Sequence, residues 1–196
     1  MNFLAHAVLS FHDPEILFGQ MISDFVKGKK QYEYPINIHQ GITLHRRIDA
    51  YTDEHPVTIE AKQFFRPAYR LYSGAFVDIV YDHFLANDRQ EFGDGQLFTF
   101  SQQVYAVLDR HTDLMPPVFA GLFPYMRREN WLLGYAQREG IYRSFRGLVS
   151  RSAFMTDSLP AARLFDKYYN ELEKCYTSFW PDLKEFTTRE IAQLKK

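Results

Sequence analysis

Hydrophobic residues recur at intervals of three or four along most of the chain, which is the period of an α-helix with one buried face. In the first segment, Leu4, Ala7, Val8 and Phe11 share one helical face. No segment of useful length alternates between apolar and polar residues as a half-buried strand would. The pattern predicts an all-α protein in which residues 1–196 form a single-domain multi-helix bundle.

Capping residues and prolines predict where these helices begin and end. Asp13 and Pro14 are typical of an N-cap and a first helical residue, and we expect the helix that they open to end near Gly28. Further helices are expected to begin near Pro35, Pro56 and Ser73, to span residues 99–115, and to continue in pieces through 118–150 with breaks near Pro124 and Gly140.

Two segments stand out by their apolar character. From Ala75 to Ala86 nearly every side of the predicted helix is apolar, which is typical of a central, buried helix. Near the C-terminal end, a long amphipathic stripe runs from Phe165 to Phe179, and we expect Pro181 to kink or break this last helix.

Ionisable side chains interrupt the apolar faces, where an unpaired charge is costly. His45 and Asp49 are four residues apart on the apolar face of the third helix. Asp78 and Asp82 have the same spacing in the most apolar helix. Buried groups of this kind are normally paired with an opposite charge or bound to a metal ion. The same holds for Asp24 on the stripe of the second helix, for His83 next to Asp82, and for His6 in the first helix.

A divalent cation would remove the repulsion between neighbouring carboxylates. A set of carboxylates and imidazoles without thiolates suits manganese, iron, zinc or magnesium, and it does not choose among them. Structural roles are the alternative. Asp78 and Asp82 could form ion pairs with Arg46, Arg47 or Arg70. His45 could form a hydrogen bond with Asp49 across one helical turn, and His6 could be an ordinary core histidine.

Composition limits the class of protein. Lysine and arginine number 23 against 24 acidic residues, and this balance argues against a nucleic-acid-binding protein. The single cysteine, Cys175, excludes an intrachain disulfide and a zinc site built from cysteines. We therefore expect the protein to be located in the reducing cytoplasm. The sequence contains no apolar run long enough to cross a bilayer, and the start of the chain lacks the pattern of a signal peptide.

Four segments together resemble those of a known family, the acyl carrier protein phosphodiesterases. They are MNFLAH at 1–6, GQMISDFVKG at 19–28, GITLHRRIDAYTD at 41–53 and DIVYDHFLA at 78–86, in the order and spacing of that family. In the second half of the chain, MRRENWLLGY at 126–135 is the best local match. The resemblance implies hydrolysis of the phosphodiester that joins 4′-phosphopantetheine to a serine of holo-acyl carrier protein, giving the apo protein and free 4′-phosphopantetheine.

The resemblance also implies a divalent metal, preferably Mn²⁺ with Mg²⁺ or Fe²⁺ as alternatives, and a fold like that of the HD-domain metal phosphohydrolases. HD-domain proteins carry adjacent histidine and aspartate residues, whereas here the corresponding residues are four apart or in reversed order. Spacing therefore leaves open which candidates bind the metal and which orient the ligands. By position the metal candidates are Asp24, His45, Asp49, Asp78, Asp82 and His83 with His6 close by, and we expect Asp24, His45 and Asp82 to be catalytic.

Acyl carrier proteins are small and acidic, so their enzyme should present basic residues near its site. Arg46, Arg47 and Lys27 are the candidates for binding the phosphate or the carrier, and helical geometry brings Arg46 nearer than Arg47 to the face of His45. Lysines at 27, 29 and 30 form one basic segment. A second lies at 127–151, where six arginines face two glutamates. Both could instead be ordinary solvated faces.

Two other functions fit the same residues. One is an HD-like phosphohydrolase that acts on a nucleotide or another small phosphate ester. The other is a non-catalytic helical module that binds an acidic partner and in which the aspartates and histidines form internal ion pairs. The sequence leaves the oligomeric state open.

Overall fold

The computed structural model describes residues 1–194 and confirms the all-α class, since these residues form α-helices and short 3₁₀-helices without a β-strand. None of the described helices is long and apolar enough to cross a membrane. The α-helices are α1 (Phe3–Val8), α2 (Pro14–Ile22), α3 (Ile36–Glu54), α4 (Pro56–Tyr69), α5 (Ser73–Asn87), α6 (Gln96–Asp109), α7 (Pro117–Arg128), α8 (Trp131–Gly134), α9 (Arg138–Arg151), α10 (Leu159–Lys167) and α11 (Tyr169–Leu194).

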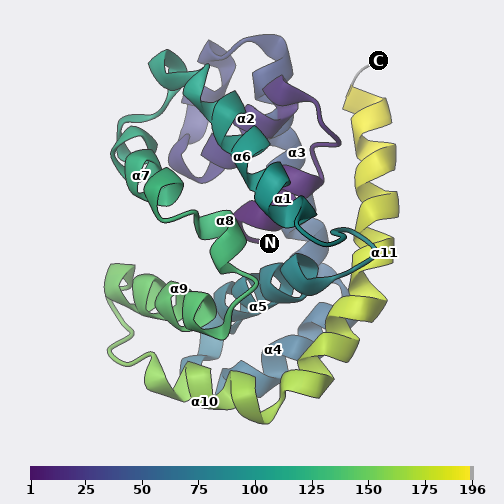
Figure 1. Ribbon diagram of the computed structural model, residues 1–196, viewed down its shortest axis with the longest axis vertical. Helices are drawn as coiled ribbons and strands as arrows, with labels where there is room; N and C mark the ends of the chain where they lie inside the picture. Colours follow the sequence, from purple (N-terminus) through teal and green to yellow (C-terminus); the bar gives the residue numbers. More distant parts are fainter. Residues whose placement is uncertain (195–196) are drawn as a thin grey trace.

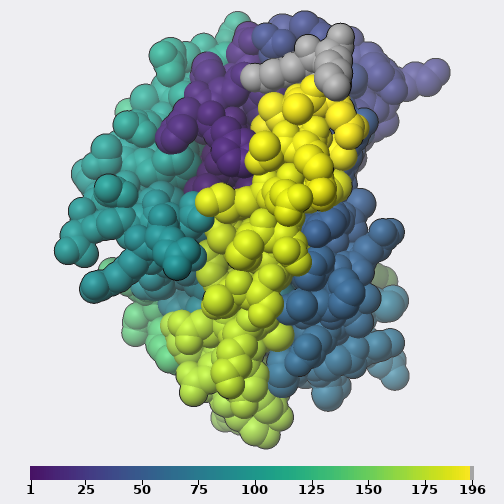
Figure 2. All heavy atoms as spheres, turned by 90° about the vertical axis from the view of Figure 1, so that its right-hand side faces the viewer, coloured from purple at the N-terminus to yellow at the C-terminus, as the bar shows by residue number. Residues whose placement is uncertain are grey.

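The helices form two groups that the last helix joins (Figure 1). One group contains α1, α2, α3, α6 and α7, and the other contains α4, α5, α9 and α10. Helix α11 packs against α3, α4 and α5, and it crosses one whole face of the molecule as a yellow band in Figure 2. The N-terminal end of the chain lies between the two groups, beside α5 and α8 (Figure 1).

Helix α5 occupies the centre, as its apolar sequence predicts. It contacts α1, α4, α9 and α11, and its residues from Ile79 to Ala86 are all buried. Because this helix is enclosed on every side, the polar side chains on it must find partners inside the protein. Asp82 and His83 do so in different directions, as described below.

Two glycines allow α2 and α3 to cross in backbone contact. A Cβ atom added to Gly41 would lie 2.4 Å from the carbonyl oxygen of Ile16, and one added to Gly19 would lie 2.2 Å from that of Ile38. Both distances are shorter than any side chain tolerates against rigid backbone. This crossing fixes the position of α3 against α2. His45 and Asp49 lie on α3 in the turns that follow Gly41.

Replacing Gly41 with alanine is expected to lower the free energy of unfolding by about 1–3 kcal/mol, the usual cost of overpacking a well-packed contact. Gly121→Ala is the matched control, since Gly121 is an exposed helical residue with open space around its Cβ position. Alanine there should stabilise the helix by up to about 1 kcal/mol. Chemical denaturation of both variants measures the difference, and equal stabilities would contradict the close crossing.

Several predicted helix ends are wrong. The second helix ends at Ile22 instead of near Gly28, and the 3₁₀-helices η1 (Ser23–Phe25) and η2 (Gly28–Glu33) follow it. At this point the hydroxyl of Ser23 donates to the carbonyl of Ile42 on α3, so the chain turns along its neighbour instead of continuing straight. The sixth helix occupies Gln96–Asp109 instead of 99–115, with the 3₁₀-helix η4 (Thr112–Leu114) after it.

Proline proved a weaker helix breaker than predicted. Pro124 lies inside α7 and Pro181 lies inside α11, and both helices continue through them. Each proline is on an exposed position, so water can bond the carbonyl that lost its helical donor. The break near Gly140 falls just before α9, and the stripe from Phe165 to Phe179 is divided between α10 and α11 at Tyr168.

Candidate metal centre

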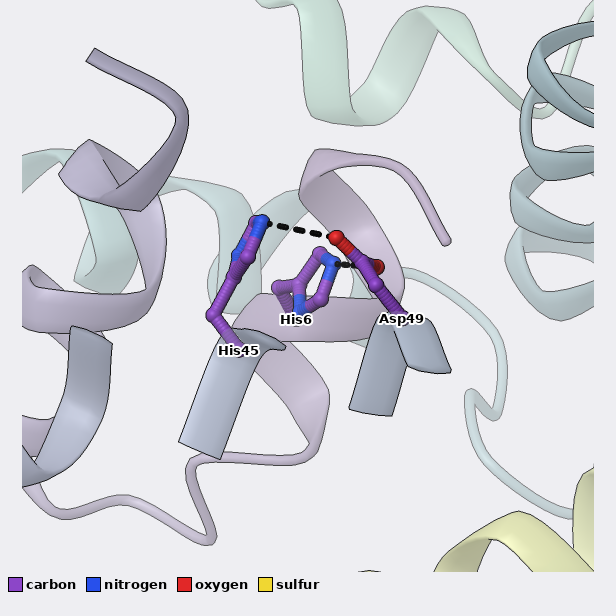
Figure 3. Close-up of side chains that lie close together, drawn as sticks. All are labelled: His6, His45 and Asp49. Atoms are coloured by element: carbon purple, nitrogen blue, oxygen red, sulfur yellow. Dashed lines mark hydrogen bonds and ion pairs between the residues drawn. The ribbon is translucent and has the colours of Figure 1, made fainter. Parts of the chain in front are cut away.

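Helices α1 and α3 bring two histidines and an aspartate together (Figure 3). His45 and Asp49 lie one turn apart on α3, and His6 reaches them from α1. The Nε2 atom of His6 is 3.2 Å from Oδ1 of Asp49, and Nε2 of His45 is 3.1 Å from Oδ2 of the same carboxylate. Asp49 therefore bridges the two rings. The three side chains are hereafter the His6–His45–Asp49 cluster.

The two imidazoles stack on each other, with ring centroids 3.8 Å apart and ring planes inclined by 17°. Both histidines are buried, whereas the carboxyl group of Asp49 is 38% exposed. A fourth group, Asp24 from η1, lies at the solvent side, where its Oδ1 atom is 3.1 Å from Nε2 of His45. Asp24 is 69% exposed and lies in a 3₁₀-helix, not on a buried helical stripe, which corrects its predicted position.

Gln20 of α2 orients His6. Its amide oxygen lies 3.0 Å from Nδ1 of His6, and with the amide assigned this way Nδ1 carries the ring proton and donates it. The lone pair of Nε2 then points at Asp49. Histidines that bind metals are commonly held in this manner, because a hydrogen bond from the second ring nitrogen fixes the tautomer.

Burial and neighbouring charges act differently on the two histidines. For His6, burial and the adjacent His45 outweigh Asp49 and lower the pKa to about 4, so its ring is neutral at physiological pH. For His45, burial opposes the charged form, but the hydrogen bonds to Asp24 and Asp49 prevail and raise the pKa to about 9. The hydrogen bond from His45 lowers the pKa of Asp24 in return. Desolvation of Asp49 is outweighed by the cationic groups around it, which lower its pKa.

This cluster could hold a metal ion. One ligand atom from each of His6, His45 and Asp49 can be chosen so that all three lie within 4.8 Å of one another. The nitrogen–oxygen separations of 3.1 and 3.2 Å are those of neighbouring ligands around an ion that binds nitrogen and oxygen at about 2.1 Å. Imidazole nitrogens with a carboxylate oxygen suit several divalent transition metals. The residues therefore fit a divalent metal ion but do not determine which one.

Asp78 borders the cluster through the amino group of Met1. The buried ammonium lies 3.0 Å from Oδ1 of Asp78 and 3.3 Å from Oδ1 of Asp49. Burial of the ammonium is outweighed by these carboxylates, which raise its pKa to about 11. Asp78, one of the predicted metal candidates, thus lies outside the cluster. It contacts the Met1 ammonium, which in turn contacts Asp49.

Asp82 and His83 point to different places. Both carboxylate oxygens of Asp82 accept backbone N–H groups at the start of α1, from Leu4 at 2.7 Å and from Ala5 at 3.2 Å. Burial raises the pKa of Asp82 to about 7 in spite of these bonds. His83 donates from Nδ1 to the carbonyl of Tyr135 and accepts the hydroxyl of Tyr169 at Nε2. Both nitrogens of His83 are therefore engaged away from the cluster.

Removing the Asp82 side chain is expected to destabilise the protein without touching a ligand atom. In Asp82→Ala two buried N–H groups of α1 lose their acceptors, and each unpaired group costs roughly 1–3 kcal/mol. Asp82→Asn keeps one acceptor oxygen and should lose less. Thermal unfolding in the presence of a chelator ranks the three proteins, and an unchanged melting temperature of Asp82→Ala would contradict the capping role.

The predicted basic residues separate into two sets. Arg46 and Lys27 line an open depression of about 520 Å³ whose wall also contains Asp24, His45 and Asp49. Arg46 donates to the carbonyl of Val26 at 3.1 Å, which holds its guanidinium over this depression. Arg47 turns the other way and pairs with Glu190 on α11.

Sequence reasoning missed Gln20 and the Met1 amine. Gln20 is 1% exposed on an otherwise apolar helix, so its pattern carries the same signal of a buried polar group as the residues that were recognised. The position of the amine depends on how α1 packs against α5, and a local sequence pattern does not contain that information.

The fold and the site define an all-α protein with a buried histidine–aspartate cluster at the wall of an open, partly basic depression. The profile of the family "Acyl carrier protein phosphodiesterase" matches residues 1–183. Curated proteins of that name are similar over most of their length: one from Yersinia pestis is 33% identical over 93% of this chain and 95% of its own, and one from Klebsiella pneumoniae (strain 342) is 34% identical over the same shares. One from Escherichia coli O45:K1 is 31% identical over 96% of this chain and 98% of its own. No solved structure matches.

The chain therefore belongs to the acyl carrier protein phosphodiesterase family, which confirms the resemblance stated from its motifs. It is an enzyme of the phosphodiesterase class. The non-catalytic alternative consequently loses its support.

Proposed function

We propose that this enzyme hydrolyses the phosphodiester between 4′-phosphopantetheine and a serine of holo-acyl carrier protein, with a divalent metal at the His6–His45–Asp49 cluster. The observation that carries the proposal is this cluster, in which Gln20 fixes one ring and the ligand atoms face one another beside an open depression. The names of the relatives supply the substrate class. The products are the apo carrier and free 4′-phosphopantetheine.

Mn²⁺ is the proposed metal, with Mg²⁺ or Fe²⁺ as alternatives. When bound, such an ion lowers the pKa of water and polarises a phosphoryl oxygen. His6, His45 and Asp49 would hold it, and Asp24 contacts His45 from the solvent side. The ionised carboxylates of Asp24 and Asp49 match the charge of a divalent cation.

Arg46 is the group proposed to bind the phosphate of the substrate. Its guanidinium lines the depression beside His45, and it is anchored to Val26 and Gln31 while its remaining donors stay available. Guanidinium groups bind phosphate oxygens through paired hydrogen bonds, which would orient the scissile bond. Arg47 is not part of this proposal, because its side chain pairs with Glu190.

The acidic carrier is proposed to approach over the lysines at the start of η2, at the rim of the depression. Lys27 and Lys29 line it and are exposed, so their charge acts on a partner through water. Such charges chiefly accelerate association and lose their effect with rising salt. The reducing cytoplasm is the proposed location, in keeping with the single unpaired Cys175.

The double variant Lys27→Glu, Lys29→Glu is expected to lower kcat/KM for holo-acyl carrier protein by about tenfold or more at low salt, with kcat nearly unchanged. Lys174→Glu, an exposed lysine of α11 far along the chain, serves as the control. Steady-state kinetics at two ionic strengths measure the effect, which should shrink as salt increases. Equal kcat/KM values for the two variants would place the carrier elsewhere.

The proposed reaction is tested by incubating the enzyme with holo-acyl carrier protein and Mn²⁺ and following the mass of the carrier. We expect the carrier to lose its 4′-phosphopantetheine group and the free group to appear in solution. An unchanged carrier mass, with Mn²⁺ shown to be bound to the enzyme, would contradict the proposed substrate. Turnover of nucleotides in the same preparation would then support the small phosphate ester instead.

A further inference from the structure

A second pocket lies beside the cluster, between α1, α5, α8 and α9. Its volume of about 290 Å³ is at the lower end of the range for small-molecule sites. Most of its lining surface is apolar, and three polar side chains from α9 are part of the wall. The principal lining residues are Phe3, Ile79, Trp131, Arg143, Ser144 and Arg151.

Part of the pocket lining is adjacent in sequence to residues that border the candidate metal centre. Two lining residues, Asn2 and Ile79, are the immediate neighbours of Met1 and Asp78. The Met1 amine contacts Asp78 at 3.0 Å and Asp49 of the cluster at 3.3 Å. Asn2 and Ile79 thus place part of the pocket wall next to the Met1 amine and Asp78, which border the cluster, and in Figure 1 the N-terminal end lies between the two groups of helices.

The wall of the pocket is preformed, because contacts among its own side chains hold it in place. Glu129 accepts a hydrogen bond from the indole nitrogen of Trp131 at 3.1 Å and pairs with Arg128 at 3.3 Å. It also lies 3.9 Å from Arg143. These contacts fix the tryptophan at the pocket and neutralise the one carboxylate there. Arg143 and Arg151 remain as donors with a positive excess.

We propose that this pocket binds the pantetheine arm of the substrate, the part beyond the phosphate. This inference rests on the function proposed above. The arm alternates methyl and methylene groups with amides, so it needs apolar walls interrupted by a few hydrogen-bond donors. Phe3, Ile79 and Trp131 supply the apolar walls. Arg143 and Arg151 supply donors for amide oxygens, and the hydroxyl oxygen of Ser144 can accept from an amide N–H.

Intrinsic fluorescence tests binding of the arm alone. Trp131 lines the pocket, and the other tryptophan, Trp180, is buried against Glu91. We expect D-pantetheine, which carries no phosphate, to change the fluorescence of the chelated enzyme, and we expect no change in Trp131→Phe. Ser144→Leu should weaken this binding by about tenfold by filling the pocket. Ser150→Leu is its control, since Ser150 lies on α9 outside the pocket with a similar hydrogen bond to its own helix.

Kinetics separate this inference from the proposed reaction. Ser144→Leu should lower kcat/KM for holo-acyl carrier protein by about tenfold and leave turnover of bis(4-nitrophenyl) phosphate, a diester without an arm, unchanged. Equal cleavage of the holo carrier by Ser144→Leu and Ser150→Leu would overturn the pocket while keeping the reaction. Binding of D-pantetheine by an enzyme that never cleaves the holo carrier would support the pocket and contradict the reaction.

Discussion

Replacing Asp49 with asparagine is expected to lower kcat for holo-acyl carrier protein by about a thousandfold, the scale of losing one preorganised electrostatic group. The substitution keeps the shape of the side chain and removes the charge that bridges His6 and His45 at 3.2 and 3.1 Å. It also removes the one carboxylate of the cluster that we propose to bind the metal. Single-turnover kinetics with the holo carrier, followed by mass, measure the loss without interference from product release.

Asp53→Asn is the matched control for this variant. Asp53 lies one turn further along α3, is exposed, and pairs with Lys62 at 2.6 Å. Its replacement should leave kcat unchanged, because an exposed ion pair contributes little to stability and lies outside the cluster. A folded Asp49→Asn enzyme that retains the activity of Asp53→Asn would exclude Asp49 from the reaction.

Removal of divalent metal is expected to lower the activity of the wild-type enzyme at least a hundredfold, and Mn²⁺ should restore it. The same ion should stabilise the fold, because a ligand that binds only the native state at a hundred times its Kd adds about 2.7 kcal/mol. Thermal unfolding with chelator and with Mn²⁺ measures this difference.

The variant Asp49→Asn separates site binding from other effects of the ion. Its melting temperature should rise much less with Mn²⁺ than that of the wild type, since it lacks the carboxylate that lies between the two imidazoles. A rise of the same size in both proteins would show that the stabilising ion binds elsewhere. Activity that survives exhaustive chelation would contradict the metal dependence itself.

How much of the site was predictable depends on the range of the interactions. His45 and Asp49 were predictable because their spacing of four residues is one helical turn, and the structure joins them to the same site. His6 was recognised as a buried group, but its partner comes from another helix 43 residues away. Asp82 and His83 were grouped because they are adjacent in sequence. Neighbours on a helix point about 100° apart, and this difference sends one to α1 and the other to Tyr135.

How much of the fold was predictable also depended on the range of the interactions. The period of the apolar residues was sufficient to predict the all-α class and the central position of α5. The helix end at Ile22 and the continuation of α7 through Pro124 and of α11 through Pro181 were not predictable, because they depend on tertiary contacts and on exposure. The hydroxyl of Ser23 donates to Ile42 of α3 in the first case, and in the other two the exposed position lets water donate to the freed carbonyls. The crossing of Gly19 with Gly41 likewise requires two positions far apart in the chain.

The most direct test of the central claim is the position of Mn²⁺ in a crystal of the enzyme, measured by anomalous scattering at the manganese edge. The account predicts a strong peak bounded by Nε2 of His6, Nε2 of His45 and the carboxylate of Asp49, and no such peak in Asp49→Asn crystals prepared in the same way. A peak bound by other residues, with the His6–Asp49 and His45–Asp49 contacts unchanged and no density between them, would contradict it.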